Sequence, residues 1–367
     1  MVVRHLSLHD FRNLESVELD PAPGLNLLCG ANAQGKTSTL EGVWVVSCGR
    51  VLRGSRDVGA VRQGQEACRV AAVLDPTGSE LAVEFAHGRN KRALLNGMKL
   101  PRASDLMGRL PVVCFWSGDL ALATGEPAER RLFVDHELCQ LSPAYLRDLA
   151  LYKRALEQRN ALLRRAQESY VPSEAFEAWE APMAESGRRL RLAREEWVGE
   201  LHAAAAQAHA DLADGEALTV RYHQNEDAPD LIALYAEHRP REIARGSSQV
   251  GPHRDDLRLE IAGNPLREFG SQGQQRTAVI SLKLATLKVA QARLGFHPVL
   301  LLDDIFSDLD QSRRSALVRA ALREGGQVFL TCTEPEQAGE DLLGRARVFA
   351  VNSGTVQPDP RYQIHGT

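Results

Sequence analysis

The stretch "GLNLLCGANAQGKTSTLEGVWVVSC" at residues 24–48 decides the fold. An apolar run stops at Gly30, the pattern G-x-x-x-x-G-K-[ST] follows, and a second apolar run with helical periodicity comes next. We therefore expect a buried strand, a glycine-rich loop and a helix from Lys36 to Cys48. A glycine loop between a strand and a helix is the context in which this pattern binds phosphate, so the stretch predicts a nucleotide-binding α/β protein.

The chemistry of the loop follows from its residue types. Glycines let the backbone wrap a phosphate, and the N–H groups at the start of a helix converge on the anion. Lys36 can reach the β- and γ-phosphates, and the Thr37 hydroxyl can ligate Mg²⁺. An accidental loop is the alternative, which the flanking strand and helix disfavour. We expect ATP and Mg²⁺ as cofactors, with nucleotide contacts from Gly30, Asn32, Gly35, Lys36, Thr37 and Ser38.

A second pattern supplies carboxylates. In "PVLLLDD" (298–304) four apolar residues indicate a buried strand, and two aspartates stand where that strand ends. We expect Asp303 to hold Mg²⁺ and Asp304 to orient a water toward the γ-phosphate, with Lys36 as the third catalytic residue. The alternative is a pair of helix N-cap residues, which the phosphate loop elsewhere in the chain makes the weaker interpretation.

The stretch "FGSQGQQRTA" (269–278) opens a third feature, a helix that starts without bulky side chains. Such a start leaves backbone N–H groups open to an anion. One subunit already has a phosphate loop, so a second anion site is surplus unless it meets the γ-phosphate bound by another copy of the chain. A flexible linker is the alternative for this stretch taken alone.

The order of the elements predicts three segments. Strands and helices alternate in both terminal thirds, which implies one α/β sheet built from both ends of the chain. Antiparallel strands are expected over 66–100, and long helices over 144–166 and 176–213, the longer spanning about 50–60 Å if unbroken. We place the domain boundaries so that 1–116 and 246–367 form the two parts of the α/β domain, and 117–245 a mainly helical insertion.

Composition limits the surroundings and the partners. The chain has 367 residues and a net charge of −4, so a nucleic-acid partner must be met by local basic patches. The six cysteines are scattered without a C-x-x-C pair, which indicates apolar fillers in a reducing compartment. The chain begins without a signal-peptide pattern and contains no stretch of ~20 apolar residues. We expect a cytoplasmic protein with no membrane partner.

Two short motifs resemble those of ABC-type ATPases. "GSQGQQ" (270–275) resembles their signature motif, and "SDLD" (307–310) resembles the D-loop after the second nucleotide-binding strand. The resemblance implies a mixed sheet with an antiparallel β subdomain, and a homodimer that forms when two ATP molecules are held between head-to-tail subunits. By the same resemblance the partner's nucleotide is contacted by Ser271, Gly273, Gln274 and Asp308.

Three further stretches, with "GSQGQQRTAVISLKLA", resemble the RecF family over essentially the whole chain. They are "HDFRNL" (9–14), "SGDLALATGEPAERRLFVD" (117–135) and "VGPHRDDL" (250–257). This resemblance implies a weak SMC-like ATPase that dimerises with ATP and binds duplex DNA near single-strand gaps. It also implies work with RecR and RecO to help load RecA, and nucleotide contacts from Arg12 and Asn13. One alternative is a non-hydrolysing scaffold, in which bound ATP only holds the subunits together. A less favoured alternative is an ABC transporter subunit.

Departures from the wider class predict slow turnover. Asp304 stands where ABC-type heads usually have a longer glutamate, and Thr331 or Thr333 stands where they have a switch histidine. The glutamine with which SMC heads sense Mg²⁺ is expected near 116–118, where the sequence reads "WSG". These differences favour a slow switch over a fast motor.

Arginine clusters are the candidate DNA contacts. The segment after the phosphate-loop helix offers Arg53, Arg56 and Arg62, and the pair Arg130–Arg131 offers a second patch. A third cluster over 188–194 is more simply a solvated helix face. His253 and Arg254, in "VGPHRDDL", suggest no chemical role from the sequence.

Overall fold

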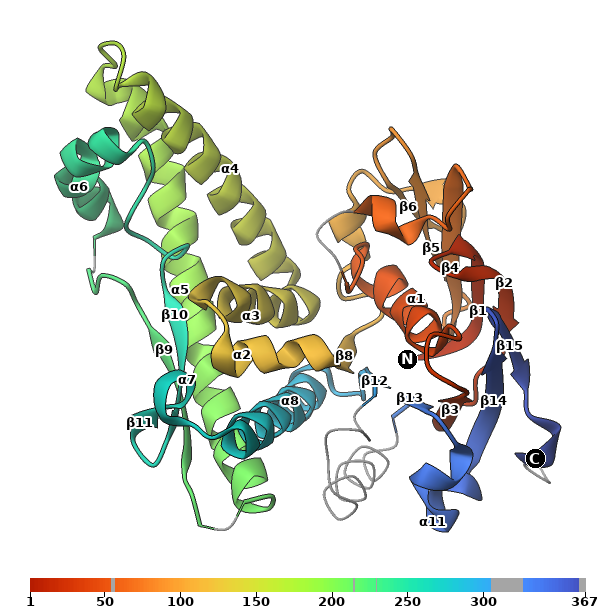
Figure 1. Cartoon of the computed structure of the whole chain (residues 1–367). Coiled ribbons are helices and arrows are strands. Elements are labelled where there is room, and N and C mark those ends of the chain that lie inside the picture. The colour runs from red at the N-terminus through yellow and green to blue at the C-terminus, as the bar shows by residue number, and fades with distance from the viewer. Residues whose placement is uncertain (54–56, 214, 229, 305–325, 363–367) are drawn as a thin grey trace. The chain divides into compact units, whose positions relative to one another are not determined.

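The computed structural model describes residues 1–53, 57–213, 215–228, 230–304 and 326–362 (Figure 1). The chain forms two compact units, residues 1–118 with 290–367 (unit 1) and residues 119–289 (unit 2). Arg56 and the D-loop-like stretch 307–310, which includes Asp308, lie outside the described residues.

Unit 1 contains an antiparallel sheet in the order β2-β1-β4-β5-β6-β7. The turn at Asn96-Gly97 joins β6 and β7, and both turn residues have positive φ, as a tight two-residue hairpin requires. The antiparallel strands expected over 66–100 are therefore confirmed. The strands are β1 (Val2–Phe11), β2 (Leu14–Leu19), β4 (Ala67–Asp75), β5 (Glu80–Ala86), β6 (Arg92–Leu95) and β7 (Met98–Lys99).

A second sheet of unit 1 is mixed, in the order β15-β14-β3-β13-β12-β8, with only β15 antiparallel. Its strands come from both ends of the chain, which confirms the prediction of one α/β sheet built from both terminal thirds. β13 lies between β3 and β12, and all three are parallel, so the loops after β3 and β12 leave the same edge of the sheet. The strands are β3 (Leu25–Cys29), β8 (Val112–Phe115), β12 (Val299–Leu302), β13 (Val328–Cys332), β14 (Ala346–Asn352) and β15 (Thr355–Pro358).

The helix α1 (Lys36–Cys48) has the predicted bounds and packs against strands of both sheets. Every residue from Ser38 to Cys48 is buried. This enclosure explains why the helix has no polar face. After Lys36, Glu41 is the one residue of the helix with a charged side chain. Shorter helical turns of unit 1 are η1 (Asp57–Ala60), η2 (Ala103–Leu106), η4 (Pro335–Ala338), α11 (Glu340–Leu343) and η5 (Pro360–Tyr362).

Unit 2 is mainly helical, with a small sheet in the order β11-β10-β9. The predicted long helices are α4 (Pro143–Arg165) and α5 (Ser173–Ala210), which pack against each other. The remaining elements are η3 (Ser117–Leu120, at the start of the unit), α2 (Ala121–Thr124), α3 (Pro127–Leu141), β9 (Leu218–His223), α6 (Leu231–Arg245), β10 (Asp256–Ile261), β11 (Asn264–Pro265), α7 (Leu266–Phe269) and α8 (Gln272–Leu294).

The compact units divide the chain at a different place from the predicted boundary at 245/246. That boundary would separate β9 from β10, which pair along their whole length from Asp256↔His223 to Ile261↔Leu218. Because this pairing ties the segment after 246 to the helical insertion, the division falls at 289/290, inside α8.

All six cysteines are buried and in the free thiol form, in agreement with their interpretation as apolar fillers. In the part of the chain that the structure describes, no helix combines the length and the apolar character needed to cross a bilayer.

Candidate functional site

The phosphate loop between β3 and α1 is closely packed at both of its glycines. A Cβ at Gly30 would lie 2.1 Å from the Val351 carbonyl oxygen, and one at Gly35 would lie 2.6 Å from Leu14 Cδ2. Gly35 also has φ of 122°, which side chains rarely adopt. The Lys36 ammonium donates to the carbonyls of Gly30 (2.6 Å) and Ala31 (2.9 Å), so it lies along the loop.

Two amide side chains, that of Asn13 outside the loop and that of Gln34 within it, tie the loop to neighbouring segments. Asn13 donates to the Ala33 carbonyl at 3.2 Å and accepts from the Ser38 hydroxyl at 2.8 Å. Gln34 accepts from the backbone N–H of Ser353, in the turn between β14 and β15. Asn13 and Ser38, both expected at the nucleotide, thus also brace the loop itself. The exposed Asn32 lies at its surface.

The carboxylate of Asp303, just after β12, meets the loop directly. Its Oδ1 accepts from the Thr37 hydroxyl at 2.9 Å and from the Thr331 hydroxyl at 3.0 Å. Burial raises the pKa of Asp303, while these two hydrogen bonds and the charge of Arg53 oppose the rise. The structure therefore brings together the two residues predicted to hold Mg²⁺.

The second aspartate lies beside the first but faces solvent. Asp304 has φ of 52°, an uncommon conformation in which Asp is enriched and which often occurs at functional sites. Its backbone N–H donates to the Thr331 hydroxyl at 2.8 Å. Thr333, by contrast, is exposed and bonds Gln337. Of the two threonines considered from the sequence, only Thr331 contacts the aspartates.

A buried carboxylate that the sequence analysis did not single out lies four residues after Thr37. Glu41 accepts from Arg12 Nε (3.0 Å) and Nη2 (2.7 Å), and it also pairs with Arg53. Arg12 Nη1 donates to the Gly59 carbonyl at 2.6 Å, so each of its guanidinium nitrogens is bound within the chain. The signal was present in the sequence, because Glu41 is the only charged residue in an otherwise uncharged run from Thr37 to Gly49.

The predicted signature segment forms the start of α8 in unit 2. The Ser271 hydroxyl accepts from the Gln274 backbone N–H (3.2 Å), and the Gln274 side chain accepts from the Ser271 N–H (2.8 Å). This reciprocal capping fixes the helix start. Among the described residues, a Cβ at Gly273 would meet no atom closer than 3.9 Å, so their packing does not require a glycine there.

The structure corrects part of the DNA-contact prediction. Arg130 is 7% exposed and forms a two-bond ion pair with Asp256, at 2.9 and 2.8 Å. Its charge is therefore used inside unit 2 and is not offered to a phosphate. Arg131 donates to the Asp255 carbonyl. Arg53 and Arg62 are partly exposed and ion-paired, Arg62 with Asp10 at 2.7 Å.

The motif "VGPHRDDL" has a structural role in unit 2. Asp255 is fully buried and accepts two hydrogen bonds from Arg191 of α5, both at 2.9 Å. His253 accepts from the Tyr152 hydroxyl at Nδ1 (2.7 Å) and donates from Nε2 to the Ser248 carbonyl (3.1 Å). Burial lowers the pKa of His253 to about 4. The motif thus ties α4 and α5 to the start of β10.

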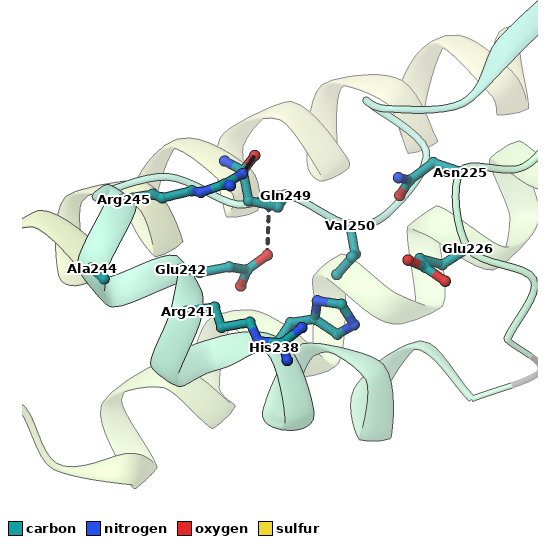
Figure 2. A pocket seen from close by; sticks show the side chains of 9 residues that line it. All are labelled: Asn225, Glu226, His238, Arg241, Glu242, Ala244, Arg245, Gln249 and Val250. Carbon is teal, nitrogen blue, oxygen red and sulfur yellow. Dashed lines mark hydrogen bonds between the residues drawn. The ribbon is translucent and has the colours of Figure 1, made fainter.

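A cavity of about 550 Å³ also lies in unit 2, beside α6. Figure 2 shows His238, Arg241 and Glu242 around it, with the hydrogen bond from the Gln249 N–H to Glu242. Arg159 neutralises the buried Glu242, and Arg245 donates to Gln249. The cavity contains none of the residues expected at the nucleotide, so it is separate from the candidate site.

The fold and the site together define a class of protein. A phosphate loop after β3, aspartates after β12 on the same sheet edge, and a capped signature-like helix start are the parts of an ABC-type ATPase head, the class that includes the SMC heads. The SMC head bound to the C-terminal winged-helix domain of ScpA has the same fold, with a TM-score of 0.56 at 14% identity over 98% of each chain.

Sequence comparison narrows the class to one family. The family model for the RecF/RecN/SMC N-terminal domain matches residues 2–356. The DNA replication and repair protein RecF of Symbiobacterium thermophilum is 39% identical, over 98% of this chain and 99% of that protein. A solved structure of the recombination mediator RecF with ATP, in the RecFOR pathway, gives a TM-score of 0.89 at 29% identity and covers 97% of each chain. The chain belongs to the RecF family.

Proposed function

We propose that this protein is a magnesium-dependent ATPase that acts as a DNA-binding clamp in recombinational DNA repair. ATP binding joins two copies on duplex or gapped DNA, and slow hydrolysis releases them. The observation that carries the proposal is the 2.9 Å contact between the Thr37 hydroxyl and Asp303. It joins the phosphate loop to the strand-end carboxylate, and these are the two groups that such ATPases need side by side.

The phosphate loop provides the nucleotide site. Lys36 already lies along the loop, and on binding of a triphosphate its ammonium would exchange the carbonyls of Gly30 and Ala31 for a phosphate oxygen. The bracing of the loop by Asn13 and Ser38 keeps the backbone in place during this exchange. Arg12 supports the site through Glu41, since its guanidinium is bound there.

The residues present fit Mg²⁺. Oxygen ligands from Thr37 and Asp303 converge, and Mg²⁺ commonly takes one or two protein oxygens while water and phosphate complete its shell. Among the described residues no cluster of three metal-binding side chains occurs, which suits a metal held largely by its nucleotide. When bound, the ion would neutralise charge on the terminal phosphates.

Hydrolysis is expected to be slow because of the two residues beside Asp303, which are Asp304 and Thr331. Asp304 is exposed and held by Thr331, and its side chain is one methylene shorter than the glutamate usual at this place. A shorter carboxylate holds water less closely to the phosphate, and a threonine cannot replace a histidine as a donor to that phosphate at the same reach. A non-hydrolysing scaffold is the second candidate, and these same two residues favour it.

The start of α8 is proposed to bind the nucleotide held by a second copy. Ser271 and Gly273 are exposed, and the packing of the described part of the chain gives no reason for the glycine. A glycine in a helix costs about 1 kcal/mol relative to alanine, so close approach by another molecule is a better explanation. Gln274 completes this surface, together with Asp308 beyond the described residues.

DNA and protein partners follow from the family. Similar proteins are named DNA replication and repair protein RecF, and a solved relative is assigned to the RecFOR pathway. We therefore propose binding to double-stranded DNA, including single-strand junctions, and cooperation with RecR, RecO and RecA. For this chain the candidate DNA contacts are Arg53 and Arg62, with Arg56 outside the described residues.

Sedimentation with and without ATP tests the proposal. Wild type should shift from monomer to dimer with ATP, whereas Ser271→Arg should bind ATP and remain monomeric. Ser173→Arg, at the exposed first residue of α5, is the matched control and should dimerise. Dimerisation of Ser271→Arg would contradict the shared nucleotide. Single-turnover hydrolysis with gapped duplex DNA then separates the clamp from the scaffold, because the scaffold leaves ATP intact.

A further inference from the structure

Two cysteines lie side by side next to the phosphate loop. Cys29 is the last residue of β3 and Cys332 is the last residue of β13, and the two are register partners in the parallel pairing of these strands. Their sulfur atoms are 2.9 Å apart. Both side chains are buried, with exposed fractions of 5% and 4%. The fold thus brings together two thiols that are 303 positions apart in the chain.

The spacing of the two strands suits a disulfide. Neighbouring strands lie about 4.7–4.9 Å apart, inside the range of about 4.4–6.8 Å that separates the Cα atoms of a disulfide. The two sulfurs are already in contact, and to form a bond they have to approach from 2.9 Å to about 2.05 Å. The strands therefore hold the thiols within reach of a covalent bond.

The hydrogen bond between the thiols gives them different roles. It is the largest cause that raises the pKa of Cys29, ahead of burial. Cys29 therefore keeps its proton and can donate it to a thiolate at Cys332, which such a hydrogen bond stabilises. The thiolate is the reactive form of cysteine. Cys68 differs, because burial is the main cause there and raises its pKa to about 12, which keeps that thiol inert.

Both cysteines are connected to parts of the candidate site. Cys29 immediately precedes Gly30, whose backbone N–H donates to the Cys332 carbonyl at 3.2 Å. Cys332 immediately follows Thr331, whose hydroxyl donates to Asp303 at 3.0 Å. A bond between the two sulfurs therefore acts on the first residue of the phosphate loop and on the threonine that holds Asp303.

We propose that Cys29 and Cys332 form a reversible oxidation site, at which a disulfide lowers the affinity of the phosphate loop for ATP. The oxidant is hydrogen peroxide, because nearly buried sulfur atoms can be reached only by a small molecule. The oxidation site itself goes beyond the proposed function. Its effect on affinity rests on the proposed binding of ATP at residues 30–38.

The reaction has two steps. The Cys332 thiolate attacks one oxygen of the peroxide, the O–O bond breaks, and a sulfenic acid forms while the departing hydroxide takes up a proton to become water. The Cys29 sulfur then attacks the sulfenic sulfur, and the hydroxyl group leaves with the Cys29 proton as a second water. Two thiols are oxidised to one disulfide, and one peroxide is reduced to two waters.

Peroxide treatment of the full chain tests the proposal. The variants are Cys29→Ser and Cys332→Ser, and Cys68→Ser is the control, since Cys68 is equally buried but lies on β4 of the antiparallel sheet. Peptide mass spectrometry without a reductant identifies the linked residues. Titration with a fluorescent ATP analogue, before peroxide, after peroxide and after dithiothreitol, gives the affinity. Thermal unfolding shows that each sample is folded.

We expect wild type and Cys68→Ser to form the disulfide and to lose ATP affinity by about fivefold or more, as is usual for two coupled sites. Dithiothreitol should restore the affinity. Cys29→Ser and Cys332→Ser should keep their untreated affinity after peroxide. Coupling is reciprocal, so in a glutathione redox buffer saturating ATP should shift wild type toward the thiols by the same factor.

Two outcomes would overturn the inference. One is folded, peroxide-treated wild type without a disulfide between Cys29 and Cys332, and the other is a disulfide that leaves ATP affinity unchanged. Where the serine variants do not fold, the glutathione measurement on wild type decides, and a ratio of disulfide to thiols that ignores ATP contradicts the coupling. Failure of untreated wild type to bind ATP would instead overturn the proposed function.

Discussion

The Thr37 hydroxyl donates to Asp303 Oδ1 at 2.9 Å, although the two residues are 266 positions apart in the chain. β3 and β12 run parallel on either side of β13, so the residues that follow them leave the same edge of the sheet. The contact is the point at which the two ends of the chain form one site. It also defines the pair of oxygens that a magnesium ion would share.

Replacing the Thr37 hydroxyl by a methyl group should abolish the effect of magnesium on ATP affinity. Thr37→Val keeps the shape of the side chain but removes one oxygen ligand, so the affinity measured with Mg²⁺ should fall by about tenfold or more, toward the value in EDTA. Equilibrium titration with a fluorescent ATP analogue measures both values. Thr39→Val is the control, since the Thr39 hydroxyl donates to the Gly35 carbonyl and makes no other hydrogen bond among the described residues. A variant that keeps the full magnesium effect would show that Thr37 is not a ligand.

Asp304→Asn should separate ATP binding from hydrolysis. The amide keeps the size of the side chain but cannot accept a proton from water, so single-turnover hydrolysis should slow by about 10²–10⁴-fold. ATP binding and dimerisation should persist, because Asp303 and Lys36 are unchanged. The variant should therefore accumulate as an ATP-bound dimer on DNA in sedimentation. If it stays monomeric with saturating ATP, ATP binding does not assemble the clamp.

The parts of the site that the sequence predicted are those set by local pattern and sheet geometry. The phosphate-loop motif at residues 30–37 is recognisable from the sequence alone. The parallel arrangement of the strands then places Asp303 near the loop. The choice between Thr331 and Thr333 needed the structure. Thr331 is the penultimate residue of β13 and points at the aspartates, whereas Thr333 lies past the strand end.

Ion pairs between distant segments could not be predicted in this way. Arg130 looked like half of a basic patch because its partner, Asp256, is 126 residues away. The ion pair of Arg12 with Glu41, 29 residues on, was likewise not foreseen. Long-range pairing depends on tertiary packing, which neither periodicity nor motif spacing encodes. A basic cluster in a sequence therefore indicates DNA only when its acidic partners are known to be absent.

Arg130→Ala should destabilise the protein without changing how its folded form responds to salt on DNA. Removing one partner of a largely buried ion pair costs about 3 kcal/mol, which urea unfolding measures. The slope of log affinity against log salt should stay at the wild-type value. Arg62→Ala is the contrasting variant, for which the slope should shrink by about 0.9 if Arg62 contacts a phosphate. A reduced slope for Arg130→Ala would restore it as a DNA contact.

His253 should make unit 2 less stable below neutral pH. Its pKa is lowered by burial to about 4, with Arg254 and Arg131 adding to the effect and Asp255 opposing it. Between about pH 6.5 and pH 4 the unfolded chain binds a proton that the folded chain excludes. The stabilising contribution is therefore complete above pH 6.5 and falls as the pH drops. Between pH 7.5 and pH 5 this one group should lower the free energy of unfolding by about 2 kcal/mol.

His253→Gln isolates this contribution, because an amide can accept from the Tyr152 hydroxyl and donate to the Ser248 carbonyl without titrating. Urea unfolding at pH 7.5 and pH 5 should show a smaller acid-induced loss in the variant than in wild type, by about 2 kcal/mol. His223→Gln, at an exposed position at the end of β9, should retain the wild-type loss. Equal acid sensitivity in wild type and His253→Gln would mean that the buried imidazole accepts its proton in the folded state. The hydrogen bonds of His253 with Tyr152 and Ser248 would then break before the unit unfolds.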